Sequence, residues 1–153
     1  MKPLVGIVVS LMLLMGSAYA TGPGPARYTS LSFDVLCGFD YETHPAIPSR
    51  VRAYNGRLVQ IAGFMLPFDY NPAGVHTFAL LKDRSACCYG ATPRMNDWIL
   101  VEMADGGTVP VMKDTPLEVR GRLQVGAEKT GNDINGQVEC LYRMRGDQVQ
   151  ALQ

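Results

Sequence analysis

The stretch Leu117-Glu118-Val119-Arg120-Gly121-Arg122-Leu123-Gln124-Val125 alternates apolar or small residues with polar ones. Because successive side chains of a strand point to opposite faces, this alternation predicts a strand with one face in a core and the other in water. It is the clearest periodic signal in the 153-residue chain. The sequence after Arg57 has the same character, which indicates a domain built mainly of strands.

The rest of the chain supplies further elements. Four more strands are predicted, at residues 57–66, 75–83, 98–103 and 137–144. The first of them is apolar on both faces, as a central strand is, and Gly63 inside it predicts a bulge or sharp bend. Turns are predicted at 130–136, as a hairpin loop, and at 145–147, before a short tail. Short helices are predicted within 30–39, capped by Ser30 or Ser32, and at 49–55.

Five strands with small helical additions place the chain in the all-β class. Closing the sheet into a barrel would remove the exposed edges that invite aggregation. We therefore predict a five-stranded Greek-key barrel of the OB type, with an open sandwich as the alternative.

The N-terminus has the features of a signal peptide. Lys2 precedes an apolar run from Leu4 to Met15, and Ala18-Tyr19-Ala20 fits a small-x-small cleavage site. The run is too short for a membrane span of about 20 residues. We predict a signal peptide at 1–20 cleaved after Ala20, a flexible leader at 21–29 and one domain at 30–153. The protein would then be periplasmic or secreted, without stable membrane insertion after cleavage.

Charge argues against a nucleic-acid partner. The chain has 14 basic and 14 acidic residues, and no block of like charge stands out. A stripe of Arg120, Arg122, Arg143 and Arg145 is therefore interpreted as a solvated face of the barrel.

The four cysteines carry most of the candidate chemistry. Cys87 and Cys88 are adjacent, in a segment whose Gly90 and Pro93 favour a turn. In an oxidising compartment each could form a disulfide with Cys37 or Cys140, and the sequence does not choose the pairing. A direct Cys87–Cys88 bond would be strained and easily reduced, which would suit a redox protein.

A metal site is the other hypothesis for this pair. Thiolates with histidine suit zinc, and thiolates with thioether suit copper(I). Of the two histidines, His76 lies near the start of a predicted strand and is the chosen helper ligand, so the predicted metal site is Cys87, Cys88 and His76. No nucleophile elbow is present, and we expect a protein that is not an enzyme.

Several segments resemble a family of exported bacterial proteins, domain-of-unknown-function family 3299 (DUF3299). The resemblance rests on residues 47–51, 55–59, 61–67, 78–81, 87–90, 93–96 and 117–121. It implies a cell-envelope location and a small β-barrel, with relatives near ABC-type transport systems and metal-handling proteins. Cys37 and Cys140 have no match in this resemblance.

The sequence thus predicts an exported, non-enzymatic binding or accessory protein of the envelope, associated with metal or with an ABC-type transporter. The alternatives are a periplasmic thiol or redox protein, and an interaction module in which the cysteines form structural disulfides.

Overall fold

The computed structural model describes residues 26–69, 72–85, 92–133 and 136–153, and for 127–133 and 136–139 it describes the backbone only. Cys87 and Cys88 lie outside the described residues. No helix in the described part is long and apolar enough to cross a membrane. The elements in chain order are β1 (Thr29–Ser30), α1 (Phe33–Cys37), α2 (Ser49–Arg52), β2 (Leu58–Pro67), β3 (Thr77–Leu81), β4 (Trp98–Met103), the 3-10 helix η1 (Ala104–Gly106), β5 (Pro116–Asp133) and β6 (Gly136–Ala151).

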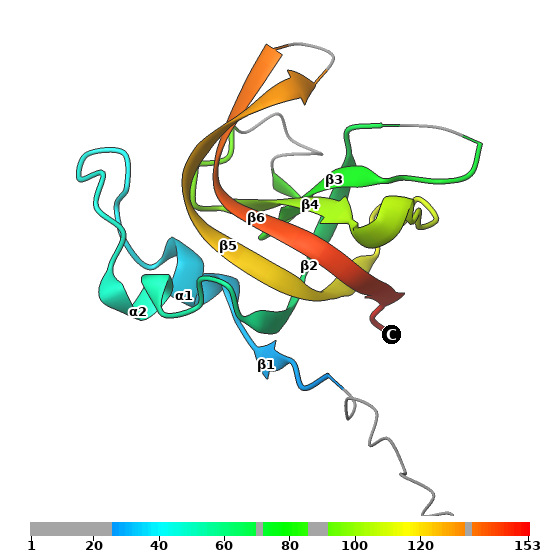
Figure 1. Cartoon of the computed structure of the whole chain (residues 1–153), viewed down its shortest axis with the longest axis horizontal. Helices are drawn as coiled ribbons and strands as arrows, with labels where there is room; N and C mark the ends of the chain where they lie inside the picture. Colours follow the sequence, from blue (N-terminus) through cyan, green and yellow to red (C-terminus); the bar gives the residue numbers. More distant parts are fainter. Residues whose placement is uncertain (1–25, 70–71, 86–91, 134–135) are drawn as a thin grey trace, which may run out of the picture.

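The strands form one sheet that closes on itself. Neighbouring strands run in the order β1-β2-β3-β4-β6-β5, and an additional pairing of β2 with β5 completes the circle. All neighbours in the closed barrel are antiparallel except β4 and β6. Figure 1 shows the long, curved β5 and β6 crossing the front of the barrel. The prediction of an all-β, five-stranded OB-like barrel is confirmed, with β1 as one extra strand.

Strand β2 belongs to both halves of the barrel. Its residues Leu58–Phe64 pair with β5, and its residues Phe64–Pro67 pair with β3. Gly63 stands where the partner changes. A Cβ atom there would lie 2.6 Å from the Leu81 carbonyl oxygen and 2.9 Å from Leu80 Cδ1. The glycine is thus explained by the close approach of β3.

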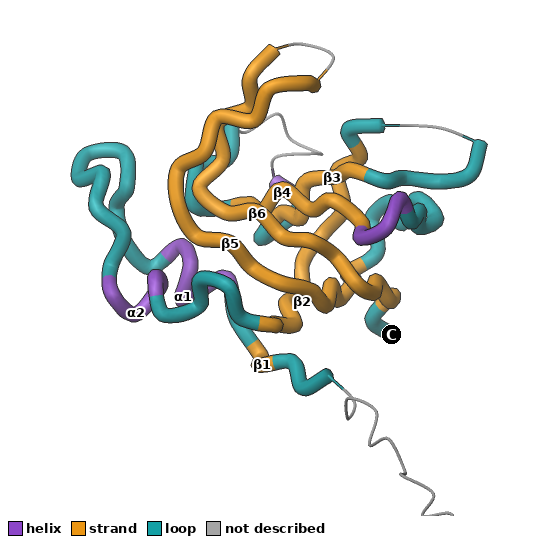
Figure 2. The backbone as a smooth tube through the Cα atoms, viewed as in Figure 1, coloured by secondary structure: helices purple, strands orange, loops and turns teal. Residues whose placement is uncertain are grey.

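The core lies inside the barrel and continues under the helices. The alternation that opens the sequence analysis is confirmed, since Leu117, Val119 and Leu123 are fully buried. Helix α1 adds Phe33 and Leu36 to the same cluster, and α2 adds Val51. The two helices lie side by side next to β5, away from η1 (Figure 2).

The N-terminal elements agree with the capping prediction. The Ser32 side chain accepts a hydrogen bond from the Asp34 amide at the start of α1. Just before this helix, β1 pairs in parallel with Val59 and Gln60 of β2, so Thr29, predicted in the leader, belongs to the sheet. The preceding Tyr28 hydroxyl donates to Asp147 at 3.1 Å.

The predicted ends of the last two strands are wrong. Strand β5 continues past Val125 to Asp133, so the predicted 130–136 loop is too long. Strand β6 continues to Ala151, where a turn at 145–147 and a tail were expected. Gly146 is a strand residue because it pairs with Met103 of β4 and Gly121 of β5, and a Cβ added to it would lie 3.0 Å from Met103 Sδ. Opposite Gly146, the pairing register of β5 with β6 shifts between Arg120 and Gly121, which forms a β-bulge.

We expect Gly63→Ala to lower the free energy of unfolding by about 1–3 kcal/mol, because the new methyl group collides with β3. Urea denaturation measures the change. Ala62→Ser adds one heavy atom at the exposed neighbouring position and should leave stability nearly unchanged. Equal stability of both variants would contradict the close-approach explanation.

Candidate functional site

The β3–β4 hairpin has two ends with different chemistry. At one end the 92–97 segment, which precedes β4, contacts α1 and the residues after it; we call this the helix end. At the other end His76, Glu102 and η1 lie together; we call this the groove end. The predicted site residues divide between the two ends.

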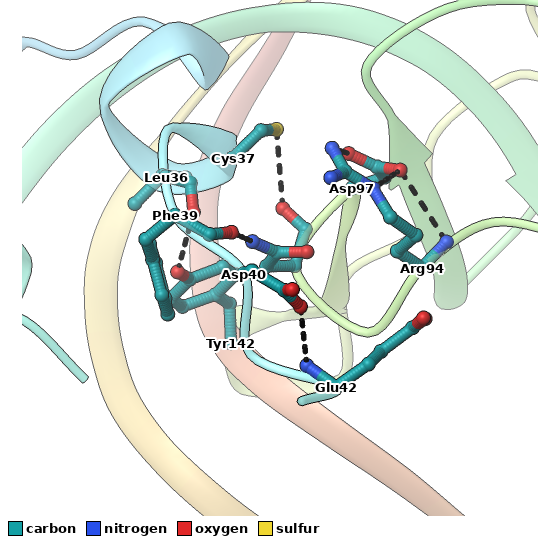
Figure 3. A network of polar contacts seen from close by, with 9 residues as sticks. Leu36, Cys37, Phe39, Asp40, Glu42, Arg94, Asp97 and Tyr142 are labelled. Atoms are coloured by element: carbon teal, nitrogen blue, oxygen red, sulfur yellow. Dashed lines mark hydrogen bonds and ion pairs between the residues drawn. The ribbon is translucent and has the colours of Figure 1, made fainter. Parts of the chain in front are cut away.

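The helix end is a network of buried hydrogen bonds (Figure 3). The Cys37 thiol donates to the Asn96 carbonyl oxygen at 3.2 Å, and Asn96 Nδ2 donates to the Phe39 carbonyl oxygen at 2.8 Å. From inside the barrel the Tyr142 hydroxyl donates to the Leu36 carbonyl oxygen at 2.8 Å. These bonds satisfy the carbonyl groups at the end of α1 and fasten the helix to the barrel.

Charges at this end fix Asp97 and hold Cys37 neutral. Arg94 binds the Asp97 carboxylate through two contacts, at 2.9 and 2.8 Å, which lowers the pKa of Asp97. Burial, and then the nearby negative charge of Asp97, raise the pKa of the Cys37 thiol to about 12, while the thiol proton itself is donated to Asn96. Because the thiolate is the nucleophile and the metal ligand, Cys37 is poorly suited to either role at neutral pH.

The connection that carries Cys87 and Cys88 is described only at its two flanks. The Ser85 amide donates to Asp83 Oδ1 at 2.8 Å on the first flank. A cavity of about 100 Å³ separates this flank from Thr92 and Pro93 on the second, with Asp97 in its wall. The two flanks therefore meet at the helix end, beside the Asp97 carboxylate.

The other two cysteines are buried. Cys37 is a thiol in α1, and Cys140 lies in β6 opposite Glu128. No disulfide joins Cys37 to Cys140 within the described ranges. Pairing with Cys87 or Cys88 stays a prediction.

His76 lies at the groove end, immediately before β3. Since the 82–97 connection leaves the other end of this five-residue strand, the length of β3, about 13 Å, separates His76 from the flanks of the cysteine pair. The imidazole Nδ1 donates to the Gly107 carbonyl oxygen at 2.7 Å, and Nε2 lies 3.8 Å from Glu102 Oε1. In the described part of the chain, no three His, Cys, Asp or Glu residues gather as metal ligands.

The structure adds site residues that sequence reasoning missed. Asn96 is the buried polar residue of the core, yet in the sequence it reads as part of a turn before a strand. Glu102 occupies an exposed position of β4, where a glutamate is ordinary, so the sequence does not mark it as a site residue. Asn96 and Asp97 stand side by side directly before the buried strand β4, and this pair is the sequence signal that points to the helix end.

The arginine stripe makes local contacts. Arg120 binds Glu118 at 2.9 Å, Arg145 binds Asp105 at 2.6 Å, and Arg122 donates to the Gly56 carbonyl oxygen at 2.5 Å. Such contacts support its interpretation as a solvated face.

We expect Tyr142→Phe to lower the free energy of unfolding by about 1–3 kcal/mol, because the buried Leu36 carbonyl group loses its donor. The matched control is Tyr54→Phe, since the partly buried Tyr54 has no hydroxyl hydrogen bond in the described structure. A loss of similar size in both variants would contradict a specific role of the Tyr142 hydroxyl.

The pKa of Cys37 predicts loss of stability in alkali. The folded protein holds the thiol proton up to a pKa of about 12, whereas the unfolded chain releases it near the ordinary value of 9.0. This contribution is complete below pH 9 and is lost as the pH rises toward 12, at up to about 1.4 kcal/mol per pH unit. Cys37→Ala should flatten the pH dependence of urea denaturation above pH 9. Val35→Ala on the same helix should lower stability but keep the slope, and an unchanged slope in Cys37→Ala would refute the assignment.

Comparison with known proteins places the chain in a family. A crystal structure of a DUF3299 family protein from Pseudomonas aeruginosa PAO1 has a TM-score of 0.60 at 19% identity, covering 84% of this chain and 98% of that one. At this identity the likeness shows the fold. No curated protein matches. The sequence model of DUF3299, described as a protein of unknown function, matches residues 40–151, so the chain belongs to the DUF3299 family.

Proposed function

We propose that this protein is an exported, non-enzymatic binding protein of the bacterial cell envelope that handles a thiophilic metal through Cys87 and Cys88. The proposal rests on how the two flanks of the loop with Cys87 and Cys88 are fixed to the barrel. Its flanks are held by the Asp83–Ser85 hydrogen bond on one side and the Asp97–Arg94 pair on the other. A fixed base supports a turn that could bring the two sulfur atoms to one metal ion.

The number of ligands bears on which metal is bound. Two thiolates suit copper(I), whereas zinc needs four ligands, of which two would have to come from elsewhere. Cys37 near the base is held protonated, and His76 stands at the opposite end of β3. We therefore propose Cys87 and Cys88 as the core of the site, with coordination left incomplete for a second protein. Incomplete coordination would suit an accessory protein that passes metal to a transporter.

The envelope location rests on the signal peptide predicted at 1–20 and on the resemblance stated above. Transfer to an ABC-type transporter rests on that resemblance alone. Both belong to the proposal.

The test uses the mature chain, Thr21–Gln153, purified from an oxidising compartment. Free thiols are counted by mass spectrometry, and bound metal is measured in the same sample. We expect about one copper or zinc per chain, lost in the Cys87→Ser, Cys88→Ser double variant, because both thiolates are required. Removal of the metal with a chelator should expose the two thiols to alkylation.

Two controls make the result specific. Thr92→Ala changes an exposed flank of the loop without removing a thiol and should retain metal. His76→Ala should also retain metal if the site consists of the two cysteines. Metal retained in the double-cysteine variant, or two disulfides with no metal, would contradict the proposal. A Cys87–Cys88 bond reduced at mild potential, without metal, would instead favour a thiol-exchange protein.

A further inference from the structure

The groove end of the barrel is a hollow of about 410 Å³ that the cysteine chemistry does not use. Its polar lining comes from three directions. His76 precedes β3, Glu102 lies on β4, and Arg143 and Arg145 lie on β6. The volume is in the range of pockets that bind small molecules.

The charges of this groove are divided between its two sides. Glu102 and Arg145 are register partners on neighbouring strands, yet the Arg145 guanidinium binds Asp105 at 2.6 Å. Glu102 is 60% exposed, and His76 Nε2 approaches its Oε1 to 3.8 Å, a distance longer than a hydrogen bond. The Glu102 carboxylate on β4 thus lies beside Arg143 and the Arg145–Asp105 pair, next to the basic groups of β6.

The acidic side is held in place by backbone contacts. The Asp69 carboxylate accepts hydrogen bonds from the amides of His76 and Thr77, both at 3.0 Å. The His76 Nδ1–H donates to the Gly107 carbonyl oxygen at 2.7 Å. Because a carbonyl group can only accept, Nδ1 carries a proton, and Nε2 is the ring atom left toward Glu102.

The lining also has an apolar part. Leu100, Met103 and Met144 border the groove and are almost wholly buried. Their small exposed part forms an apolar floor beside the charged groups, and the combination is complementary to a molecule with an ammonium group, a carboxylate and a short apolar chain.

We propose that this groove binds a small zwitterion of the amino-acid type. The ammonium group lies at Glu102 and His76 Nε2, the carboxylate at Arg143 and Arg145, and the side chain over Leu100 and Met103. A guanidinium has five N–H donors, so Arg145 can keep Asp105 and still meet a carboxylate. This inference is independent of the metal proposal, because the groove uses neither cysteine and the described flanks of the cysteine loop lie at the other end of the β3–β4 hairpin.

The test is a titration of the ¹⁵N-labelled mature chain with L-leucine and L-methionine, followed by amide chemical shifts. Shifts should concentrate at His76, Glu102, Gly106, Gln124 and Arg143. Isoamylamine and 4-methylvalerate, which are L-leucine without its carboxylate and without its ammonium group, should bind at least about tenfold more weakly, because each loses one set of charged hydrogen bonds. Glu102→Gln and Arg143→Gln should each weaken binding of L-leucine by about tenfold or more.

Matched controls separate groove binding from general charge effects. Glu42→Gln and Arg57→Gln make the same changes at exposed positions outside the groove and should leave the affinity unchanged. The proposal is overturned if neither amino acid shifts the groove amides, if the single-charge analogues bind as tightly as the amino acids, or if the control variants weaken binding equally. The Cys87→Ser, Cys88→Ser variant should bind L-leucine normally, so failure of either proposal can be recognised without the other.

Discussion

The barrel depends on one strand that has two partners. β2 pairs with β5 along its first seven residues and with β3 along its last four, sharing Phe64. If it paired with only one of them, the sheet would stay open and leave edges to be covered. Gly63 permits the exchange, because β3 comes too close there for any side chain. This closure joins β2, β3, β4, β6 and β5 into one barrel, on which the β3–β4 hairpin has its two ends.

Much of this fold could be predicted from local patterns. The alternation at 117–125 reports a half-buried strand directly, and the apolar run at 57–66 reports the strand β2, although one face of β2 is buried and the other only partly covered. The misjudged features depend on partners distant in sequence. Gly146 has the composition of a turn residue, but it pairs with Met103 of β4, and residues 145–147 continue as strand. Composition signals a loop at 130–136, but cross-strand pairing with β6 keeps the chain extended through Asp133.

The candidate site could be predicted only in part, for a topological reason. His76, near the start of a predicted strand, is the histidine assigned as helper ligand to Cys87 and Cys88. The length of β3 lies between His76 and the described flanks of the cysteine pair, and the grouping of the three residues stays a prediction. The residues brought to the helix end are Cys37 and Asn96, which are distant in sequence. Their meeting is set by the closure of the barrel, which no local pattern reports.

The two ends of the hairpin differ in a way that bears on binding. At the helix end the polar groups of the core already form hydrogen bonds with one another. Asn96 is 1% exposed and donates to the Phe39 carbonyl oxygen, and the Tyr142 hydroxyl donates to the Leu36 carbonyl oxygen. Breaking such bonds would leave unsatisfied groups in the core, so this end is suited to rigid support. At the groove end Glu102, Asp105 and Arg145 are largely exposed, and rearranging them costs little. A small ligand can therefore displace water at the groove end without disturbing the core, whereas a ligand at the helix end would have to break buried hydrogen bonds that support the fold.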